Sequence, residues 1–435
     1  MPARARTILL RGGQRRPPQR LSVCDIEPGA VVVRRAAAFA HRLDPERLLV
    51  GLRACLAELP LLAGRLRRGA DGWWEVTCDD AGLRYTVVDE DRPMPAYGYD
   101  QAMKPDISRL TEPLTLATVD RDRPLVGVRV TRFQGGTVLG LSNTHALMDG
   151  LGAWRLLERW SQHYRGHASA APLTFDRAPL LPPTSPPTLA RHPAPPSPLS
   201  PLGLAGFIAR ALLATRTRAS ALLHLPAALL ADAKAELGAQ LPAGEWLSTQ
   251  DVVMGLLVHG LTAATAQPQL HIGTIYDLRR IAGLGLTPAY TGNAATFRDL
   301  VEPRAELART PLHLARALRR LAATLTPERA LTDLRALEAR VTPANALRHM
   351  PLFMRRLFAD GLLLNNYSAF PIYRLDFGHG PPRWGDYPRL PLGRVLTVCP
   401  DPHGDGVAVH LTLPHDELRR FVPPRGAGPL HPVGA

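Results

Sequence analysis

A histidine and an aspartate stand four residues apart in the first half of the chain, in the pattern His145-x-x-x-Asp149-Gly150. The unperturbed pKa of a histidine is about 6.5, so a neutral imidazole is available near pH 7 to accept a proton. A positioned general base of this kind typically accelerates a reaction about 10²–10⁴-fold. We therefore predict that His145 is a general base. Our hypothesis is that it takes a proton from an alcohol or an amine, which then attacks an acyl thioester.

Asp149 has a different predicted role, because a glycine follows it. Its carboxylate could orient the imidazole. A carboxylate at a sharp turn, however, usually makes local backbone hydrogen bonds or an ion pair that holds the turn. We therefore assign Asp149 to structure rather than to proton transfer. The pattern is short and also occurs by chance, so on this pattern alone an ordinary histidine at the end of a strand is the better explanation of His145.

The segments around the motif have the periodicities that would position it. Alternating valines predict a half-buried strand over 125–133, and a Gln-Gly-Gly turn leads into a second strand over 137–141. Large apolar residues then recur at helical spacing over 150–165. His145 should therefore lie where a strand ends and a helix follows, near a sheet edge or a cleft.

The composition predicts a globular protein with room for two domains. The chain has 435 residues, of which 46% are apolar and 21% charged. Its net charge of +14 would suit nucleic acid, a membrane or a phosphorylated cofactor. The arginines are scattered, however, without the basic and aromatic interleaving of a nucleic-acid platform. We therefore predict no nucleic-acid partner. A basic composition without a functional role explains the net charge at least as well as an anionic partner does.

The cysteines and the apolar runs predict a cytoplasmic protein without a membrane span. No two cysteines have the spacing of metal ligands, and so few in a long chain form no disulfide framework, so we expect reduced thiols. No apolar run reaches the ~18–20 residues that a span requires. The longest, over 252–266, contains His259 and predicts a buried helix. The cysteines are Cys24, Cys55, Cys78 and Cys399.

A proline-rich segment over 171–205 divides the chain. Its eleven prolines are too dense for a helix or a central strand, so we predict an extended linker on the surface. The flanking domains would be residues 1–170 and 206–435. Both mix strands and helices, which predicts an α/β (α+β) architecture with a ligand site at the interface between the domains.

Further elements are predicted from periodicity and from turn or capping residues. The expected strands lie at 7–10, 31–38, 72–77, 83–88, 220–225, 271–277, 362–364, 372–377, 395–398 and 406–413. The expected helices lie at 45–59, 204–216, 226–237 with Pro226 in the first position, 252–266, 312–338 with a break at Pro327, and 416–421.

A second short motif, near the C-terminus, adds a family resemblance. Asp376, Phe377, Gly378 and Gly380 form the pattern Asp-Phe-Gly-His-Gly, 231 residues after His145. Together the two motifs resemble the signatures His-x-x-x-Asp-Gly and Asp-Phe-Gly-Trp-Gly of the BAHD acyltransferases. These are acyl-CoA-dependent transferases of the chloramphenicol-acetyltransferase-like superfamily. Weaker matches extend the resemblance over nearly the whole chain, at residues 59–66, 277–279, 292–294 and 370–373.

The resemblance implies two chloramphenicol-acetyltransferase-like domains with a channel between them. His145 would be the base in that channel, with acyl-CoA entering from one face and the acceptor from the other. Asp149 would pair with Arg279 of the second domain, and the Asp-Phe-Gly turn would hold the cofactor side of the channel. The implied protein is a monomer of secondary metabolism with acyl-CoA as co-substrate and no permanently bound cofactor. The oxyanion donor stays open between backbone N–H groups near Gly150 and the side chains of Asn293 or Asn366.

The activated thioester requires no metal, only a base and oxyanion stabilisation. One departure from the family is His379, which stands where the second signature has tryptophan. The other is Asn365-Asn366-Tyr367, where the family usually has Ser/Thr-rich residues before an aromatic. Two alternatives are a stand-alone condensation-type domain that uses carrier-protein thioesters and a non-catalytic member that only binds acyl-CoA. Thr144 argues against the condensation-type domain, because such domains often have a second histidine there. The intact His145, Asp149 and Arg279 argue against a non-catalytic member.

Overall fold

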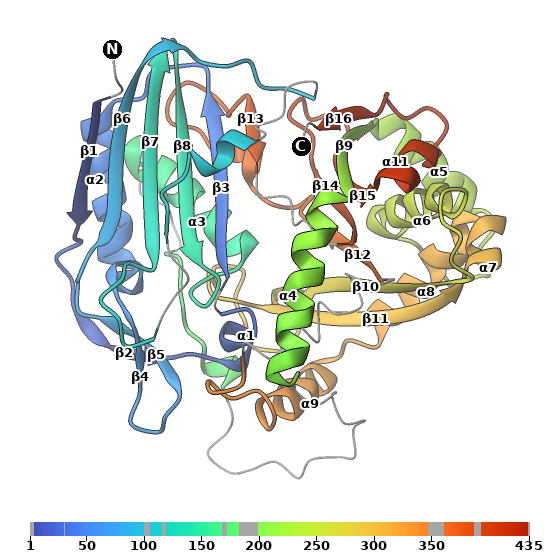
Figure 1. The fold of residues 1–435 in the computed structure, drawn as a ribbon, viewed down its shortest axis with the longest axis horizontal. Helices are drawn as coiled ribbons and strands as arrows, with labels where there is room; N and C mark the ends of the chain where they lie inside the picture. The colour runs from blue at the N-terminus through green and yellow to red at the C-terminus, as the bar shows by residue number, and fades with distance from the viewer. Residues whose placement is uncertain are drawn as a thin grey trace.

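Two sheets side by side form the body of the protein, each with helices packed against it (Figure 1). The structure is a computed structural model that describes residues 4–29, 31–99, 105–114, 119–167, 172–181, 199–346, 361–386 and 393–433. Most of the predicted proline-rich linker, 182–198, lies outside the described residues. The mixed α/β architecture predicted from the sequence is confirmed.

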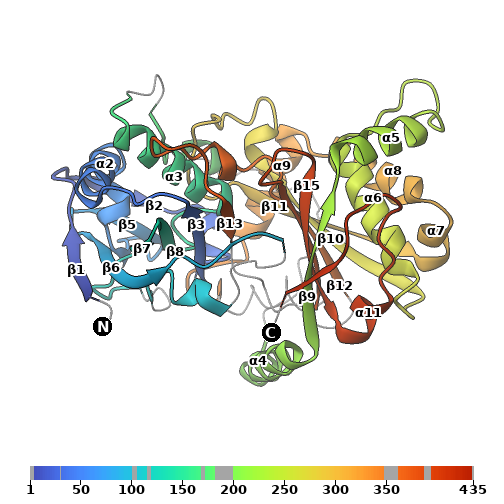
Figure 2. The same cartoon turned by 90° about the horizontal axis from the view of Figure 1, so that it is seen from above.

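The first sheet has six strands, and the hairpin predicted before His145 lies in its middle. The strands β7 and β8 pair antiparallel around Gly135, whose φ of +78° is one that glycine adopts without strain. The helices α2 (Pro45–Glu58) and α3 (Gly150–Tyr164) pack together over one face of this sheet (Figure 2). In order, the strands are β1 (Arg4–Leu10), β6 (Leu83–Pro93), β7 (Val126–Gln134), β8 (Gly136–Thr144), β3 (Val32–Phe39) and β13 (Trp384–Asp386).

The second sheet has seven strands around a separate apolar core. In order, they are β11 (Ala295–Pro303), β10 (Gln269–Asp277), β12 (Gly361–Asn366), β14 (Arg394–Pro400), β15 (Val407–Pro414), β9 (Arg218–Leu225) and β16 (His431–Val433). The helices of this half are α4 (Pro201–Arg216), α5 (Ala227–Gly238), α6 (Thr249–Thr262), α7 (Arg304–Arg309), α8 (Pro311–Ala323), α9 (Pro327–Glu338) and α11 (His415–Arg420). A small third sheet contains β2 (Arg16–Arg20), β5 (Trp74–Cys78) and β4 (Leu66–Arg68), and α1 (Val23–Ile26) follows β2.

The buried helix α6 shows why the longest apolar run belongs to a folded core. Ser248 and Asp251 form a reciprocal capping box that starts the helix at Thr249, three residues before the predicted start. Most of its side chains are buried between the second sheet and α8. In the described part of the chain, every helix is too short or too polar to pass through a bilayer.

The strand β13 connects the two halves. It comes from the C-terminal half but pairs antiparallel with β3, with Trp384 opposite Ala38. Trp384 is only 1% exposed and packs in a core with Ala36 and Ala38 of that strand. The segment from Ile372 to Asp386 therefore leaves the predicted domain 206–435 and completes the first sheet.

Three local predictions differ from the structure. The strand predicted over 372–377 is wrong, because a 3-10 turn forms over Ile372–Arg374 and a second turn follows, in which the Asp376 side chain accepts from the N–H groups of residues 378–380. Pro226 is the residue before α5 rather than its first residue, since its ψ of 148° is extended. The helix α4 begins at Pro201, inside the predicted linker, because Ser200 accepts a cap hydrogen bond from Gly203.

Candidate active site between the two sheets

The backbone of His145 is held by residues from both halves of the chain. The residue directly follows β8, its N–H donates to the carbonyl of Val31 at 2.8 Å, and its own carbonyl accepts from Nδ2 of Asn293 at 2.7 Å. The side chain is half-buried, and its Nδ1 is buried without a hydrogen-bond partner in the structure described. Burial lowers the pKa of the imidazole below its usual value, while the nearby Asp149 opposes this shift. A neutral imidazole is therefore favoured, as a proton acceptor requires.

Asp149 lies at the N-terminus of α3 and binds groups from the second half. Its Oδ1 accepts the helix-capping hydrogen bond from Gly152 at 2.8 Å. Its Oδ2 accepts from Nη2 of Arg279 at 2.9 Å and from the N–H of Ala294 at 3.1 Å. The predicted partners Asp149 and Arg279 are therefore in direct contact, in an ion pair whose side chains are 11% and 3% exposed.

Arg279 binds four groups at once, which fixes the chain around it. Besides Asp149, the guanidinium donates to Asp277 at 2.8 Å and to the carbonyls of Tyr290 and Gly292 at 2.8 Å and 2.6 Å. The two carboxylates raise its pKa above the usual arginine value against the effect of burial. The first turn of α3 approaches this loop so closely that a Cβ on Gly152 would lie 1.9 Å from the carbonyl oxygen of Thr291. The ion pair thus joins the two halves beside His145.

Asn293 is part of a buried polar network that the sequence analysis did not find. Its Nδ2 donates both to the carbonyl of His145 and to Oδ1 of Asp25, the latter at 2.8 Å, so neither amide proton is left for an oxyanion. Asp25 is fully buried and accepts from Nε of Arg177 at 2.8 Å. Asn366, the other predicted candidate, ends β12 and accepts from the N–H of Ser368 at 2.9 Å. No described contact occupies the Nδ2 group of Asn366.

Arg35 is a second site residue that was missed. It is 1% exposed, and its Nη1 donates to Oδ1 of Asn143 at 2.8 Å. Asn143 in turn donates to the carbonyls of Thr144 and Met148, which holds the turn that contains His145. The Nε and Nη2 of Arg35 are buried without hydrogen-bond partners in the structure described, and burial lowers its pKa to about 10. Its charge also disfavours protonation of the imidazole.

The Asp-Phe-Gly motif lies at the opposite end of α3. Oδ1 of Asp376 accepts from the N–H groups of Gly378, His379 and Gly380 at 2.7–3.1 Å, and Oδ2 accepts from Arg165 at 3.1 Å. Gly378 and Gly380 have φ of +90° and +86°, which glycine adopts most easily. Asp149 and Arg165 are the N- and C-caps of the helix and are about 24 Å apart at 1.5 Å per residue, so the motif lies at the end of α3 that is away from the base.

Phe377 and His379 attach this motif to the first sheet and its helices. Phe377 is 1% exposed and makes edge-on contacts with Phe39, Trp160 and Tyr164, at ring distances of 5.3–5.6 Å. His379, which stands in place of the family tryptophan, stacks on His41 at 4.8 Å. The motif therefore has structural contacts and none with His145 among the described residues.

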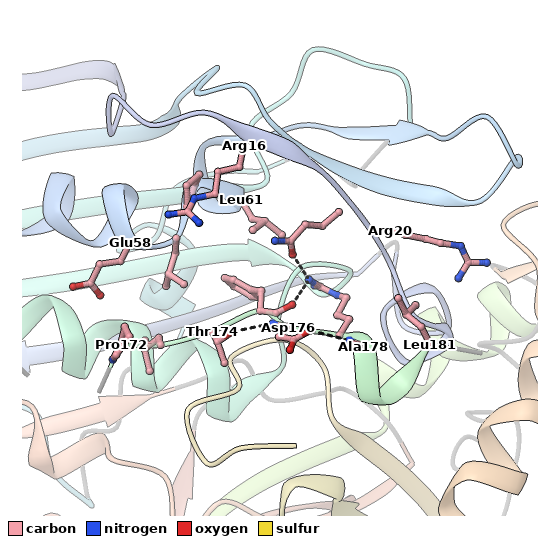
Figure 3. A pocket seen from close by; sticks show the side chains of 15 residues that line it. Arg16, Arg20, Glu58, Leu61, Pro172, Thr174, Asp176, Ala178 and Leu181 are labelled. Atoms are coloured by element: carbon pink, nitrogen blue, oxygen red, sulfur yellow. Dashed lines mark hydrogen bonds between the residues drawn. The ribbon is translucent and has the colours of Figure 1, made fainter. Parts of the chain in front are cut away.

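A pocket of about 780 Å³ opens on the first half, and Figure 3 shows the three segments that line it. These are the region of Arg16 and Arg20, the turn that follows Glu58, and the stretch 172–181. Its lining includes Arg177, which contacts Asp25, but not His145. The reacting atoms therefore would not meet in this pocket.

Two comparisons of sequence place the chain among known enzymes. The profile of the Transferase family matches residues 32–424. Rosmarinate synthase of Plectranthus scutellarioides is 26% identical over 396 residues, which cover 87% of this chain and 86% of that protein. A hydroxycinnamoyltransferase of Narcissus pseudonarcissus is 29% identical over 191 residues, and that alignment spans 42% of this chain and 43% of the relative.

The fold is similar to that of solved acyltransferases. One such structure is F. sporotrichioides TRI101 complexed with coenzyme A and T-2. It superposes on this chain with a TM-score of 0.69 and 16% sequence identity, and the superposition covers 93% of this chain and 96% of the TRI101 chain. Because the family profile spans most of the chain, membership follows from sequence, and the superposition adds the fold. The chain therefore belongs to the Transferase family, the BAHD acyltransferases, with a chloramphenicol-acetyltransferase-like fold of two sheet-and-helix halves.

Proposed function

We propose that this protein transfers an acyl group from acyl-CoA to the hydroxyl or amine of a small acceptor, with His145 as the general base. The observation that carries the proposal is His145, whose imidazole is half-buried with a pKa lowered by burial and whose backbone is held by residues from both halves of the chain. Family membership supports acyl transfer in general.

In the proposed reaction, His145 takes the proton of the acceptor while the acceptor oxygen or nitrogen bonds to the thioester carbonyl carbon. The carbonyl electron pair moves to oxygen and gives a tetrahedral intermediate. Its collapse re-forms the carbonyl, breaks the carbon–sulfur bond and releases coenzyme A, whose sulfur takes the proton from the imidazolium. Nothing is consumed other than the two substrates, because the thioester is already activated.

The remaining site residues would position the base and stabilise charge. Asp149, Gly150 and Arg279 would hold the turn that follows His145, and the Asp-Phe-Gly motif would fix the far end of α3. Since both amide protons of Asn293 are already donated, the oxyanion would bind backbone N–H groups near Gly150 or the side chain of Asn366. The buried charge of Arg35 would favour the oxyanion at a distance.

The substrates and the domain division are also proposals. Acyl-CoA as donor agrees with the coenzyme A named in the TRI101 complex, and hydroxycinnamoyltransferases among the relatives suggest aromatic acyl groups and alcohol or amine acceptors. We infer a channel between two domains, residues 1–170 and 206–435, which the crossover 171–205 joins. The strand β13 belongs to the sheet of the first domain.

Thr144 stands where condensation-type domains often have a second histidine, and its hydroxyl donates a hydrogen bond to the carbonyl of Gly29.

Free acyl-CoA should suffice as the donor. We expect the purified chain, incubated with a panel of acyl-CoAs and of alcohols and amines, to release coenzyme A only when an acceptor is present. The product should gain the mass of the acyl group. Turnover that requires a carrier-protein thioester would favour the condensation-type alternative. Binding of acyl-CoA without turnover on either donor would favour a non-catalytic member.

The pH dependence should follow the depressed pKa of His145. Burial lowers this pKa below the usual value of about 6.5, so the imidazole stays neutral to a lower pH than in a free histidine. Activity should therefore be full above pH ~6.5 and fall only as the pH drops through the lower, folded-state pKa. The acid limb of kcat/KM, which reports groups of the free enzyme, measures this. An acid limb with its midpoint above pH ~7 would contradict the assignment.

A further inference from the structure

The helix α4 stands apart from both sheets (Figures 1 and 2). It forms because Ser200 caps its N-terminus and Pro201 occupies the first position, where a missing N–H does no harm. The side toward the protein includes Ala214, which is only 7% exposed. Large apolar side chains nevertheless face solvent: Leu202 is 86% exposed, Ile208 49%, Leu212 65% and Leu213 61%.

These four side chains lie on one side of the helix. At 3.6 residues per turn they fall within an arc of roughly 140° around the helix axis. We call this set, Leu202, Ile208, Leu212 and Leu213, the α4 apolar face. An ordinary surface helix turns such an arc toward the core, so the orientation here is the reverse of the usual one. A contiguous exposed apolar surface of this kind marks an interaction site more often than it occurs by chance.

The charged side chains of α4 and of the sequence on either side of it are basic. Arg210 and Arg216 belong to the helix and are exposed, whereas Arg218, which follows it, is half-buried near Glu417. The sequence has no aspartate or glutamate from Arg177 to Ala231. The whole chain carries a net charge of +14. An anionic partner is therefore attracted both by the helix and by the protein as a whole, whereas a second copy would place two basic helices against each other.

We propose that the α4 apolar face docks onto the surface of an anionic lipid bilayer. The leucines and the isoleucine would enter the boundary between headgroups and acyl chains. Arg210, beside the face, and Arg216, at its C-terminal end, would contact lipid phosphate and carboxylate groups. The helix has 16 residues, about 24 Å at 1.5 Å per residue, which is shorter than the ~30 Å hydrocarbon core and suits a position along the surface. This inference is independent of the acyl-transfer proposal.

Vesicle sedimentation of the full chain tests the inference. We expect the wild-type protein to sediment with vesicles of phosphatidylcholine and phosphatidylserine at about 0.15 M salt, and much less with phosphatidylcholine alone or at about 1 M salt. The double variant Leu202→Asp/Leu213→Asp should lower the partition coefficient about tenfold or more, since both apolar anchors are lost. The double variant Arg210→Gln/Arg216→Gln should weaken binding and reduce its salt dependence.

A matched control is the variant Val50→Asp/Val422→Asp, which places the same charges on exposed apolar residues elsewhere, 63% and 54% exposed. It should bind vesicles as the wild type does, and all variants should keep their circular dichroism spectra. Equal loss of binding in this control, or no sedimentation of the wild type with anionic vesicles, would overturn the proposal. So would a concentration-dependent dimer in analytical ultracentrifugation that Leu202→Asp/Leu213→Asp abolishes, because a second copy would then cover the face.

Discussion

The variant His145→Ala should lose acyl transfer, with kcat/KM lowered about 10²–10⁴-fold, the range for a positioned general base. The loss should appear mainly in kcat, because the imidazole accepts the proton in the transition state and contributes little to substrate binding in the ground state. The fold should persist, since the contacts of His145 with Val31 and Asn293 use its backbone atoms. Steady-state kinetics with free acyl-CoA, together with circular dichroism, would measure both effects.

The matched control is His167→Ala, which removes an exposed histidine just beyond the C-terminus of α3. This variant should retain wild-type kinetics. If His145→Ala kept near-normal turnover, or if both variants lost activity to the same extent, the imidazole of His145 would not be the base. The channel proposed around it would then have no support.

The second large effect is expected at the ion pair of Asp149 and Arg279. Arg279→Met should lower the free energy of unfolding by about 3–5 kcal/mol, because it leaves the carboxylate of Asp149 without its ionic partner. Asp149→Ala should cost less, because Arg279 keeps its ion pair with Asp277. Activity should fall as well, since the pair holds the turn that follows His145. The double variant should lose less than the sum of the two single losses, as expected for residues in direct contact.

Urea unfolding of the four proteins in this cycle measures the coupling. The exposed pair of Glu306 and Arg309, whose side chains are 43% and 75% exposed, is a suitable control, because removing it should cost about 1 kcal/mol or less. Fully additive losses at Asp149 and Arg279 would mean that the two residues stabilise the protein separately. The joining of the halves would then have to depend on other contacts.

Local periodicity was sufficient to predict the elements that flank the base. The hairpin before His145, the helix after Asp149 and the break predicted at Pro327 all depend on residues within a few positions of each other. The hairpin and the helix are confirmed, and the break is found directly before Pro327, which begins α9. The contact between Asp149 and Arg279 was found only through the family pattern, because 130 residues separate the two. Periodicity alone carries no information on such a distance.

The missed features depend on contacts between distant segments. Asp25 binds Arg177, which is 152 residues away. The capping box of Ser22 and Asp25 is a local signal for a helix start, but nothing near either residue marks their pairing. Arg35 lies in a strand whose other buried residues are small or apolar. A charged residue in such a predicted buried strand was a signal of a functional or structural role that could have been used. The short strand from Trp384 to Asp386 is recognisable only by its pairing with β3.

That pairing has a consequence for synthesis on the ribosome. One edge of the strand β3 can pair with β8 as soon as β8 has been translated. The partner of its other edge, β13, is translated roughly 240 residues after the end of β8. At about 5–20 residues per second this delay is roughly 12–50 s. During that interval the backbone edge of β3 is open to pairing with other nascent chains. Release of the C-terminal segment is therefore the event that closes the edge and links the maturation of both halves.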